Sequence, residues 1–394
     1  MDHQKPVLKK NLLDELPVPP EGMTGWPWTT EFDTDNYFEK TEYPKISIIT
    51  PSFNQGKYIE QTIRSVLLQN YPNLEYVIID GGSTDGTVDI IRKYEKWITY
   101  WVSESDKGQS DAINKGLKKI NGEIFNWINS DDYYNENTFF KISGNFIADK
   151  TDLIIGNYRF FEEGNEINDR TIDFRLRDSL EETIAFVLIN QPSSFFSLKV
   201  FRELGGLNTD LNFVMDQDIW KRYLYAFGQE RIKIIDEELT HFRLHSDSKS
   251  YINEFNNEYM NIYYSIALQA GMDAHAEFIR EIYGKGFRDN YKFNLPDDKK
   301  NNGLSGRVIN SLVYFKARNA FTNHDTELFK KCIEIIDPSF LNADQNEYLS
   351  NLKLKTKLKD LKLDPLLKAW TAISRKMKKK KETPGISNLK SEKK

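Results

Sequence analysis

The chain has little of what marks secreted, cysteine-metal or membrane-spanning proteins. Its 394 residues include one cysteine, Cys332, which excludes an intrachain disulfide and any zinc site built on several thiolates. Residues 1–20 break every apolar run with a charge or a proline, and no later stretch approaches the ~18 apolar residues that span a bilayer. We therefore expect a cytoplasmic protein, in a reducing compartment, that does not cross a membrane.

Charge is unevenly divided along the chain. The net charge is -5, but residues 353–394 carry 15 Lys and Arg against 4 Asp and Glu, so residues 1–352 are strongly acidic. An acidic body excludes a nucleic-acid binder, whose basic surface would lie on its folded core. The apolar and cationic segment 366–381 suits peripheral contact with an anionic membrane, such as the inner face of the cell membrane. A solvated end without a partner is the alternative.

Four apolar runs, each followed by a helical pattern, occupy the region after the first 44 residues. They are residues 45–50, 74–80, 98–104 and 123–129. This alternation predicts an α/β fold with a mostly parallel sheet flanked by helices. Each run ends in a polar or glycine-rich loop, and the loops after parallel strands meet at the edge of the sheet where ligands bind.

The pattern divides the chain into four parts. Residues 1–43 are expected to form an N-terminal arm. Residues 44–250 are expected to form the α/β domain, which continues into mixed strands and a marked helix at 216–227. Beyond it we expect a helical C-terminal module at 251–352 and a basic tail at 353–394 that is helical or disordered.

Two aspartates flank the glycine-rich loop after the second apolar run. Asp80 precedes Gly81 and Gly82, where the chain can approach a ligand closely. We interpret Asp80 as an acceptor for the ring N–H of uracil or thymine, and the alternative is that it only caps the turn. Asp85 stands where the next helix begins, so we assign the capping role to it.

The sharpest local signal is the pair Asp131 and Asp132, directly after a buried strand. Adjacent carboxylates in such a place are costly unless a cation or hydrogen-bond donors neutralise them. Their hard oxygen atoms suit Mg²⁺ or Mn²⁺, ions that also bind substrate phosphates. The alternative is a cap for the helix that begins near Asn135.

Two further candidates lie late in the α/β region. Asp216 and Asp218 open a helix, and either can be the general base that takes a proton from a hydroxyl while the other caps the helix. In the segment THFRLH, strand-like alternation places His241, Arg243 and His245 on one face. His245 is a candidate metal or diphosphate ligand, with Arg243 or Lys249 to balance phosphate charge; an ordinary surface or core histidine is the alternative.

These residues lie in segments that resemble family 2 glycosyltransferases, the large inverting group with the GT-A fold. The resemblance covers residues 45–250 and includes ISIITPSFNQGKYIEQTIRSVLLQNYPNLEYVIIDGGSTDGT, DKGQSDAINKG, GEIFNWINSDD, MDQDIWKRY and FRLHSDSKS. It implies the nucleotide-diphospho-sugar transferase fold and a part in bacterial cell-surface polysaccharide synthesis. The site residues that it implies are Pro51 and Phe53 beside the nucleobase, Asp80 bonded to the base, Lys107, Asp111 and Asp131 near the nucleotide sugar, Asp132 and His245 at the metal, and Asp216 as catalytic base.

The resemblance implies a reaction as well. A hexosyl or N-acetylhexosaminyl group would pass with inversion from a nucleotide sugar, with UDP preferred, to a hydroxyl of a saccharide or lipid-linked saccharide, using Mn²⁺ or Mg²⁺. Asn129 stands at the first acidic position of the family's metal motif, and aligning the tryptophan of MDQDIWKRY selects Asp216 over Asp218. One alternative is a sugar nucleotidyltransferase, although PSFNQGKY is not a basic phosphate loop. The other is an inactive scaffold that binds a nucleotide sugar.

Overall fold

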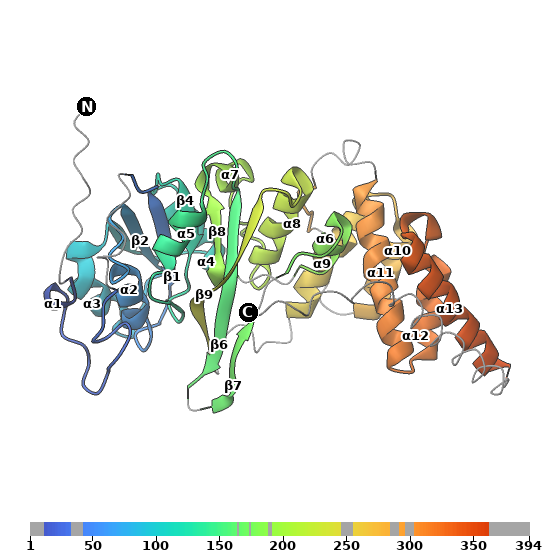
Figure 1. The fold of residues 1–394 in the computed structure, drawn as a ribbon, viewed down its shortest axis with the longest axis horizontal. Coiled ribbons are helices and arrows are strands. Elements are labelled where there is room, and N and C mark those ends of the chain that lie inside the picture. Colours follow the sequence, from blue (N-terminus) through green and yellow to red (C-terminus); the bar gives the residue numbers. More distant parts are fainter. Residues whose placement is uncertain are drawn as a thin grey trace, which may run out of the picture. The chain divides into compact units, whose positions relative to one another are not determined.

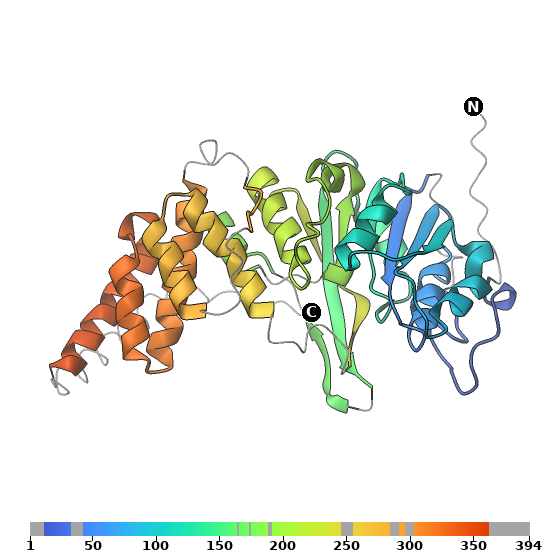
Figure 2. The same ribbon diagram turned by 180° about the vertical axis from the view of Figure 1, so that it is seen from behind.

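The computed structural model describes residues 12–32, 42–163, 165–172, 175–187, 191–245, 255–283, 291–295 and 303–361. The chain divides into two compact units, residues 1–305 and residues 306–394. Figures 1 and 2 show the larger unit as one sheet with helices on both of its faces. Lys249 and the basic segment 366–381 lie outside the described residues, so what we expect of them stays a prediction.

The parallel half of the sheet consists of the four strands that the sequence predicts. They run in the order β3-β2-β1-β4, and every pair among them is parallel. Their bounds are β1 (Ile46–Ser52), β2 (Leu74–Asp80), β3 (Tyr100–Ser103) and β4 (Ile124–Trp127). β1 and β4 are buried at every position, which explains their nearly continuous apolar pattern. The predicted α/β fold is confirmed.

The connections between these strands place helices on both faces. α2 (Ile59–Leu67) and α3 (Thr87–Tyr94) link β1 to β2 and β2 to β3, stepping in one direction across the sheet. α4 (Gln109–Leu117) leads from β3 back to β4 in the opposite direction. Because such crossovers are right-handed, α4 packs on the face opposite α2 and α3. The strand order thus reverses between β1 and β4, and ligands bind beyond the strand ends at such a switch point.

The other half of the sheet is mixed. β8 is antiparallel to both β4 and β6, whereas β9 is parallel to β6 and pairs with β5 on its other side. The bounds are β5 (Tyr133–Tyr134), β6 (Leu153–Glu162), β7 (Asn165–Ile172), β8 (Ser194–Ser197) and β9 (Ile232–Leu244). The sequence segments RIKII (231–235) and THFRLH (240–245) lie, except for Arg231 and His245, in one continuous strand, because β9 follows β6 through register shifts on both sides of Asn157. The carboxyl ends of β4 and β9 therefore point to the same edge.

A buried arginine fastens the N-terminal arm to the sheet domain. Arg64 of α2 is fully buried, and its guanidinium donates to the carbonyl oxygens of Pro27 and Trp28 at 3.0 and 2.8 Å. The indole N–H of Trp26 donates to the carbonyl oxygen of Tyr134 at 2.7 Å. These tryptophans belong to the anchor that holds the arm in place.

Shorter elements complete the larger unit. They are α1 (Leu12–Glu15), η2 (Glu95–Trp97), α5 (Thr138–Asn145), α6 (Leu180–Ala185), η3 (Gln191–Ser193), α7 (Leu198–Glu203), α8 (Met215–Phe227), α9 (Phe255–Gln269) and α10 (Asp273–Tyr283). The sequence pattern suggested a boundary near residue 250, but α9 and α10 lie in the same compact unit as the sheet. The reason is that side chains of α9, Glu258 and Tyr263, bond to the backbone before α8 and at the end of α6.

The smaller unit is helical, as the sequence predicts for this part of the chain. It begins within α11 (Leu304–Thr322) and continues through α12 (Thr326–Ile335), η6 (Pro338–Phe340) and α13 (Ala343–Asp360). Apolar side chains on these helices form its interior, among them Phe329 and the fully buried Cys332. Of the helices that the structure describes, none combines the length and the apolar character that crossing a membrane requires.

Candidate active site

The loops after β1, β2 and β3 meet around Gly81. A Cβ atom at this glycine would lie 2.8 Å from Oδ2 of Asp106 and 3.3 Å from the ring of Phe53, so a larger residue here would displace these side chains. Pro51 is buried in β1 opposite Ile79, whereas the Phe53 side chain is 59% exposed. An exposed aromatic face beside a glycine suits contact with a flat apolar ring. This geometry agrees with the predicted places of Pro51 and Phe53 beside a nucleobase.

Asp80 ends β2 as the centre of a dense hydrogen-bond network. It is completely buried, and its Oδ2 accepts the N–H groups of Gly82 and Ser83 at 3.1 and 2.9 Å and the hydroxyl of Ser103 at 2.6 Å. Its Oδ1 accepts the hydroxyl of Ser83 at 2.5 Å. Asp80 therefore does shape the turn, the role that the sequence left as the alternative. Its bond to a nucleobase, which Oδ1 would have to make, stays a prediction.

Asp85 ties the first two loops to α3. Its Oδ1 accepts the N–H and the hydroxyl of Thr87 at 3.1 and 2.5 Å, and its Oδ2 accepts the N–H of Gly56 at 2.9 Å. Partial burial raises the pKa of this carboxyl, but the hydrogen bonds outweigh it and leave the pKa below its ordinary value. Asp85 is a structural carboxylate, as expected.

Lys107 and Asp111 lie where α4 begins. The backbone N–H of Lys107 donates to Oδ2 of Asp111 at 3.0 Å, and the same carboxylate lies 3.7 Å from Nζ of Lys115. The Lys107 side chain is exposed. It is thus accessible to a ligand, as its predicted contact with the nucleotide sugar requires.

The end of β4 brings Asp131 to the end of β9. Oδ2 of Asp131 lies 2.9 Å from Nε2 of His245, although the two residues are 114 positions apart. The imidazole of His245 packs against Tyr58 at the start of α2, with ring centroids 4.7 Å apart. Neither the pairing nor the aromatic support could be deduced from the spacing of these residues.

Asp132 is more deeply placed than its neighbour. It is 1% exposed; its Oδ1 accepts the backbone N–H of Arg243 at 2.9 Å, and its Oδ2 accepts the side-chain amide of Asn129 at 3.3 Å. Burial, and then the charge of Asp131, raise the pKa of Asp132 well above its ordinary range. A cation beside the two carboxylates would relieve this cost.

Arg243 connects this aspartate pair to its surroundings. Its Nε donates to the carbonyl oxygen of Asp131 at 2.9 Å, and its guanidinium also bonds Gln61 at 2.6 Å and pairs with Glu163. The guanidinium lies 4.8 Å from the ring centroid of Tyr58. Arg243 therefore holds the loop that carries the two aspartates, and the prediction that Arg243 or Lys249 balances phosphate charge stays a prediction.

The donor set fits a divalent ion only in part. Among the described residues, no group of three or more His, Cys, Asp and Glu side chains could hold a metal by itself. The Asp131–His245 pair offers one carboxylate and one imidazole, which suits an ion whose other ligands come from a diphosphate. The resemblance paired His245 with Asp132 at the metal. In the structure, Nε2 of His245 lies next to Oδ2 of Asp131, and Asp132 is more deeply buried than Asp131. The roles of these residues at an ion therefore stay predictions.

Asp216 opens α8 in an environment that suits a base. Its Oδ1 accepts the N–H of Gln217 at 2.7 Å. Burial of the carboxyl raises its pKa to about 6, although this hydrogen bond and the charge of Lys221 act in the opposite direction. Part of the residue still reaches solvent. A carboxylate with a pKa near neutrality can accept a proton and release it again at the working pH.

Asp218 is fully engaged elsewhere. Its Oδ2 forms a buried ion pair with Arg222 at 2.6 Å, and its Oδ1 accepts the hydroxyl of Tyr291 at 3.0 Å. Arg222 also donates to the carbonyl oxygen of Gly206 at 2.8 Å, so Asp218 stabilises the loop that leads to α8. Of the two aspartates, Asp216 is the one left to serve a substrate.

α4 is bonded both to the loop after β4 and to the loop that leads into α8. At its first residue, the side-chain amide of Gln109 donates to Oδ1 of Asn129 at 2.6 Å. Farther along, Asn114 exchanges two hydrogen bonds with the backbone of Leu207, at 2.8 and 2.9 Å. The loop at Leu207 continues into α8. α4 therefore bonds both the loop after β4, through Asn129, and the segment that leads to Asp216.

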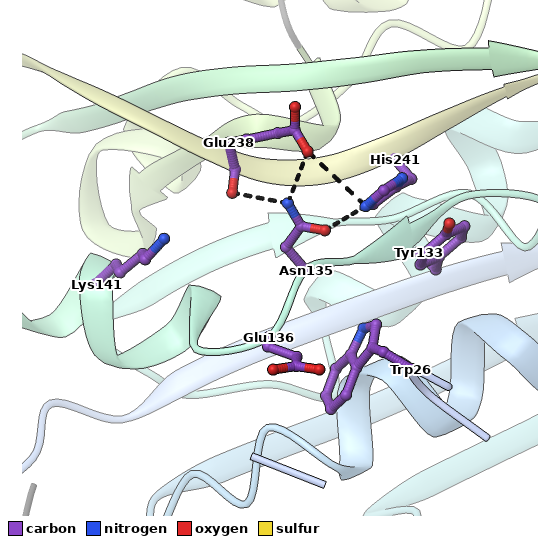
Figure 3. A pocket seen from close by; sticks show the side chains of 7 residues that line it. All are labelled: Trp26, Tyr133, Asn135, Glu136, Lys141, Glu238 and His241. Carbon is purple, nitrogen blue, oxygen red and sulfur yellow. Dashed lines mark hydrogen bonds and ion pairs between the residues drawn. The ribbon is translucent and has the colours of Figure 1, made fainter. Parts of the chain in front are cut away.

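A separate polar pocket of about 360 Å³ lies beside β5 and β9 (Figure 3). It is lined by Trp26, Tyr133, Asn135, Glu136, Lys141, Glu238 and His241. Asn135 donates to the carboxylate of Glu238 at 3.1 Å and bonds His241, whose ring stacks on Tyr133 with centroids 4.3 Å apart. Burial lowers the pKa of His241 to about 4. Trp26 of the arm and side chains of β9 line the same pocket, and Asn135, Glu238 and His241 within it bond one another.

Comparison with known proteins identifies the family to which the chain belongs. Residues 47–205 match the family described as Glycosyl transferase family 2. An uncharacterized glycosyltransferase of Haemophilus influenzae is 30% identical over 194 residues, which are 46% of this chain and 76% of the relative. This chain belongs to glycosyltransferase family 2. The matched residues contain the loops after β1, β2, β3 and β4, so the likeness to the family includes the whole parallel half of the sheet.

Other matches show how much of this chain, and how much of each relative, the likeness covers. An uncharacterized glycosyltransferase of Rickettsia conorii is 29% identical over 232 residues, 56% of this chain. This chain spans only 34 to 38% of the length of three such Rickettsia relatives. The structure of S. aureus TarS residues 1–349 in complex with UDP-GlcNAc matches 84% of this chain and 92% of that one, with a TM-score of 0.51 and 18% identity. At that identity the match shows a shared fold.

Several residues at the site have no signal in the sequence. Arg64, Gln61 and Glu258 are ordinary polar residues of predicted helices, and only their burial and their partners reveal what they hold. Lys221 is completely buried one turn beyond Gln217. The sequence indicates only that a charged residue, Lys221, lies among apolar residues of a helix. It does not indicate which side chains that charge contacts.

Proposed function

We propose that the protein is an inverting, metal-dependent glycosyltransferase that moves a sugar from a UDP-sugar to a hydroxyl of a saccharide or lipid-linked saccharide. The observation that carries this proposal is the meeting of Asp131 and His245 at 2.9 Å, at the ends of β4 and β9, beside the sheet's switch point. A carboxylate and an imidazole joined there from distant parts of the chain suit a divalent ion and a diphosphate.

The donor would lie across the loops of the parallel half. The exposed ring of Phe53 would stack on the base, Asp80 would accept its ring N–H through Oδ1, and Lys107 would face the phosphates. Asp111 would hold the loop of Lys107 through the backbone bond at 3.0 Å. TarS, which shares the fold, binds UDP-GlcNAc, so this nucleotide sugar is the first donor to test.

Mn²⁺ or Mg²⁺ would be held by Asp131 and His245, with Asp132 behind them, and when bound would neutralise charge on the departing diphosphate. Asp216 would accept the proton of the acceptor hydroxyl. As the acceptor oxygen forms its bond to the anomeric carbon, the bond from that carbon to the diphosphate oxygen breaks, and the electron pair leaves with the diphosphate. A single displacement of this kind inverts the anomeric configuration.

The acceptor would approach from the side of α8. A role in cell-surface polysaccharide synthesis, with peripheral contact of segment 366–381 at the inner face of the membrane, would place the enzyme near a lipid-linked acceptor. Co-sedimentation with anionic vesicles would test this contact by comparing the full chain with one ending at Asp364. Equal binding of the two would contradict it.

A panel of nucleotide sugars, each with Mn²⁺, Mg²⁺ or a chelator, tests the main proposal. We expect metal-dependent release of UDP in the presence of a saccharide acceptor and a product of inverted configuration by NMR. The acid limb of kcat should lie near pH 6, because protonation of Asp216 removes the base. Donor binding without any turnover across the panel would refute the proposal in favour of a binding scaffold.

A further inference from the structure

Helix α9 lies outside the residues that match the family, yet it is bonded to the segment that leads into α8. The carboxylate of Glu258 accepts the backbone N–H groups of three successive residues: Asn212 at 2.9 Å, Phe213 at 2.6 Å and Val214 at 3.1 Å. Glu258 is itself 4% exposed. Asp216, the candidate base, follows two residues after the last of these.

The segment before α8 is bonded by this carboxylate and not by a cap from its own N-cap residue. Val214 occupies the N-cap position and makes no side-chain hydrogen bond to the helix. Successive backbone N–H groups that point the same way form a binding site for an anion. The chain fills that site with its own carboxylate, from a residue 44 positions beyond Val214. Removal of this carboxylate would leave the buried N–H of Val214 and the partly buried N–H groups of Asn212 and Phe213 without this acceptor.

A second contact from α9 reaches the same part of α8. Lys221 is completely buried; its Nζ donates to Oε1 of Gln217 at 2.8 Å and lies 4.7 and 5.1 Å from the ring centroids of Tyr259 and Tyr263. The hydroxyl of Tyr263 donates to the carbonyl oxygen of Ala185 at 2.8 Å, which fixes that ring. α9 thus holds a buried ammonium group close to the start of α8.

We propose that Glu258 is a positioning residue for Asp216, and that α9 completes the catalytic unit by holding both the segment before α8 and the charge beside its base. This inference rests on the proposed function. Among the described residues, the charged and titratable groups at the start of α8 and packed against it include Asp218, Lys221 and Arg222 on α8, Glu258, Tyr259 and Tyr263 on α9, and Tyr291, which bonds Asp218. α9, which carries no recognisable motif, therefore belongs to the machinery of transfer.

The first test replaces Glu258 with glutamine, which keeps the size of the side chain and removes its charge. Glu277→Gln on α10 is the matched control, because Glu277 is exposed on the next helix of the same unit. We expect Glu258→Gln to lower kcat roughly 10- to 100-fold, the loss typical of a displaced catalytic group, while KM for the donor and metal-dependent donor binding stay unchanged. Hydrogen exchange of the peptide that contains residues 212–214 should become faster in this variant alone.

A second variant separates positioning from simple loss of stability. Lys221→Met keeps the length of the side chain and removes the charge that lowers the pKa of Asp216, so the acid limb of kcat should move up by about one pH unit. Unchanged kcat and exchange in Glu258→Gln, with an unmoved limb in Lys221→Met, would overturn the positioning role. A wild-type enzyme that transfers no sugar would instead overturn the proposed function.

Discussion

The two halves of the sheet hold their functional side chains by different means. In the parallel half, Asp80 bonds residues two, three and 23 positions away, all in its own loop or the next strand. Where the mixed half meets it, Asp132 in the loop between β4 and β5 bonds the backbone of a residue of β9 that is 111 positions away, and Arg243 of β9 reaches Gln61 across 182 positions. The first half is stabilised locally, whereas the second depends on segments that meet only when the whole domain folds.

The largest expected effect is that of replacing Asp216 at the start of α8. Asp216→Asn should lower the transfer rate by about 10²- to 10⁴-fold, because the amide cannot accept the hydroxyl proton. Donor binding, which we assign to the parallel half, should be unchanged by calorimetry. Asp89→Asn is the control, since that carboxylate is 77% exposed in a surface ion pair. Substantial transfer by Asp216→Asn would remove the base from this residue.

The next effect compares two of the buried arginines, Arg243 and Arg64. Arg243→Met and Arg64→Met should each lower the free energy of unfolding by about 3 kcal/mol, because each leaves buried partners unpaired. Only Arg243→Met should also weaken metal-dependent donor binding, since Arg243 holds the loop of Asp131 and Arg64 holds the arm. Denaturant unfolding and donor titrations give the two quantities. Equal loss of binding in both variants would contradict the separation of these roles.

A smaller effect is expected at the end of β9. His245→Asn should weaken Mn²⁺-dependent donor binding at least about tenfold, the loss that even a supporting residue of a metal site causes. His241→Asn is a matched control on the same strand face, because His241 bonds Asn135 in the polar pocket. Titration of the donor with and without a chelator measures the difference. A similar loss in both variants would mean that β9 acts on the site only through its fold.

The smallest effect concerns the parallel half. Phe53→Ala should reduce donor affinity about fivefold, the value of one aromatic contact of ~1 kcal/mol, and should leave the melting temperature unchanged. Ile147→Ala, at a side chain 57% exposed, controls for loss of an exposed apolar group. Unaltered affinity in Phe53→Ala would place the nucleobase elsewhere.

The donor-side loops could be predicted from the sequence because their information is local. The apolar run 74–80 matches β2 residue for residue, and the glycines after it mark the loop that the backbone needs. The alternative weighed for Asp80, turn capping, is also what the structure shows its carboxylate doing. A side chain can serve a turn and a ligand at once, and a sequence pattern does not separate these roles.

The mixed half could be predicted only as a set of elements. The pattern marks THFRLH as extended, but not its fusion with RIKII into one strand, because β9 is set by its pairing with β6 through two register shifts. Likewise, α9 is recognisable as a helix, whereas the bond from Glu258 to the segment before α8 depends on how α9 packs. Long-range contacts of this kind leave no periodic trace along the chain.

By itself, the sequence determined the α/β fold, the loops that follow β1 to β4 and the acids that they carry, because apolar periodicity and turn chemistry act over a few residues. The tertiary structure alone decided which of those acids meets His245, which arginine supports the loop and which glutamate holds α8. These choices arise from burial, since a charge or a donor removed from water must find its partner wherever the fold brings one.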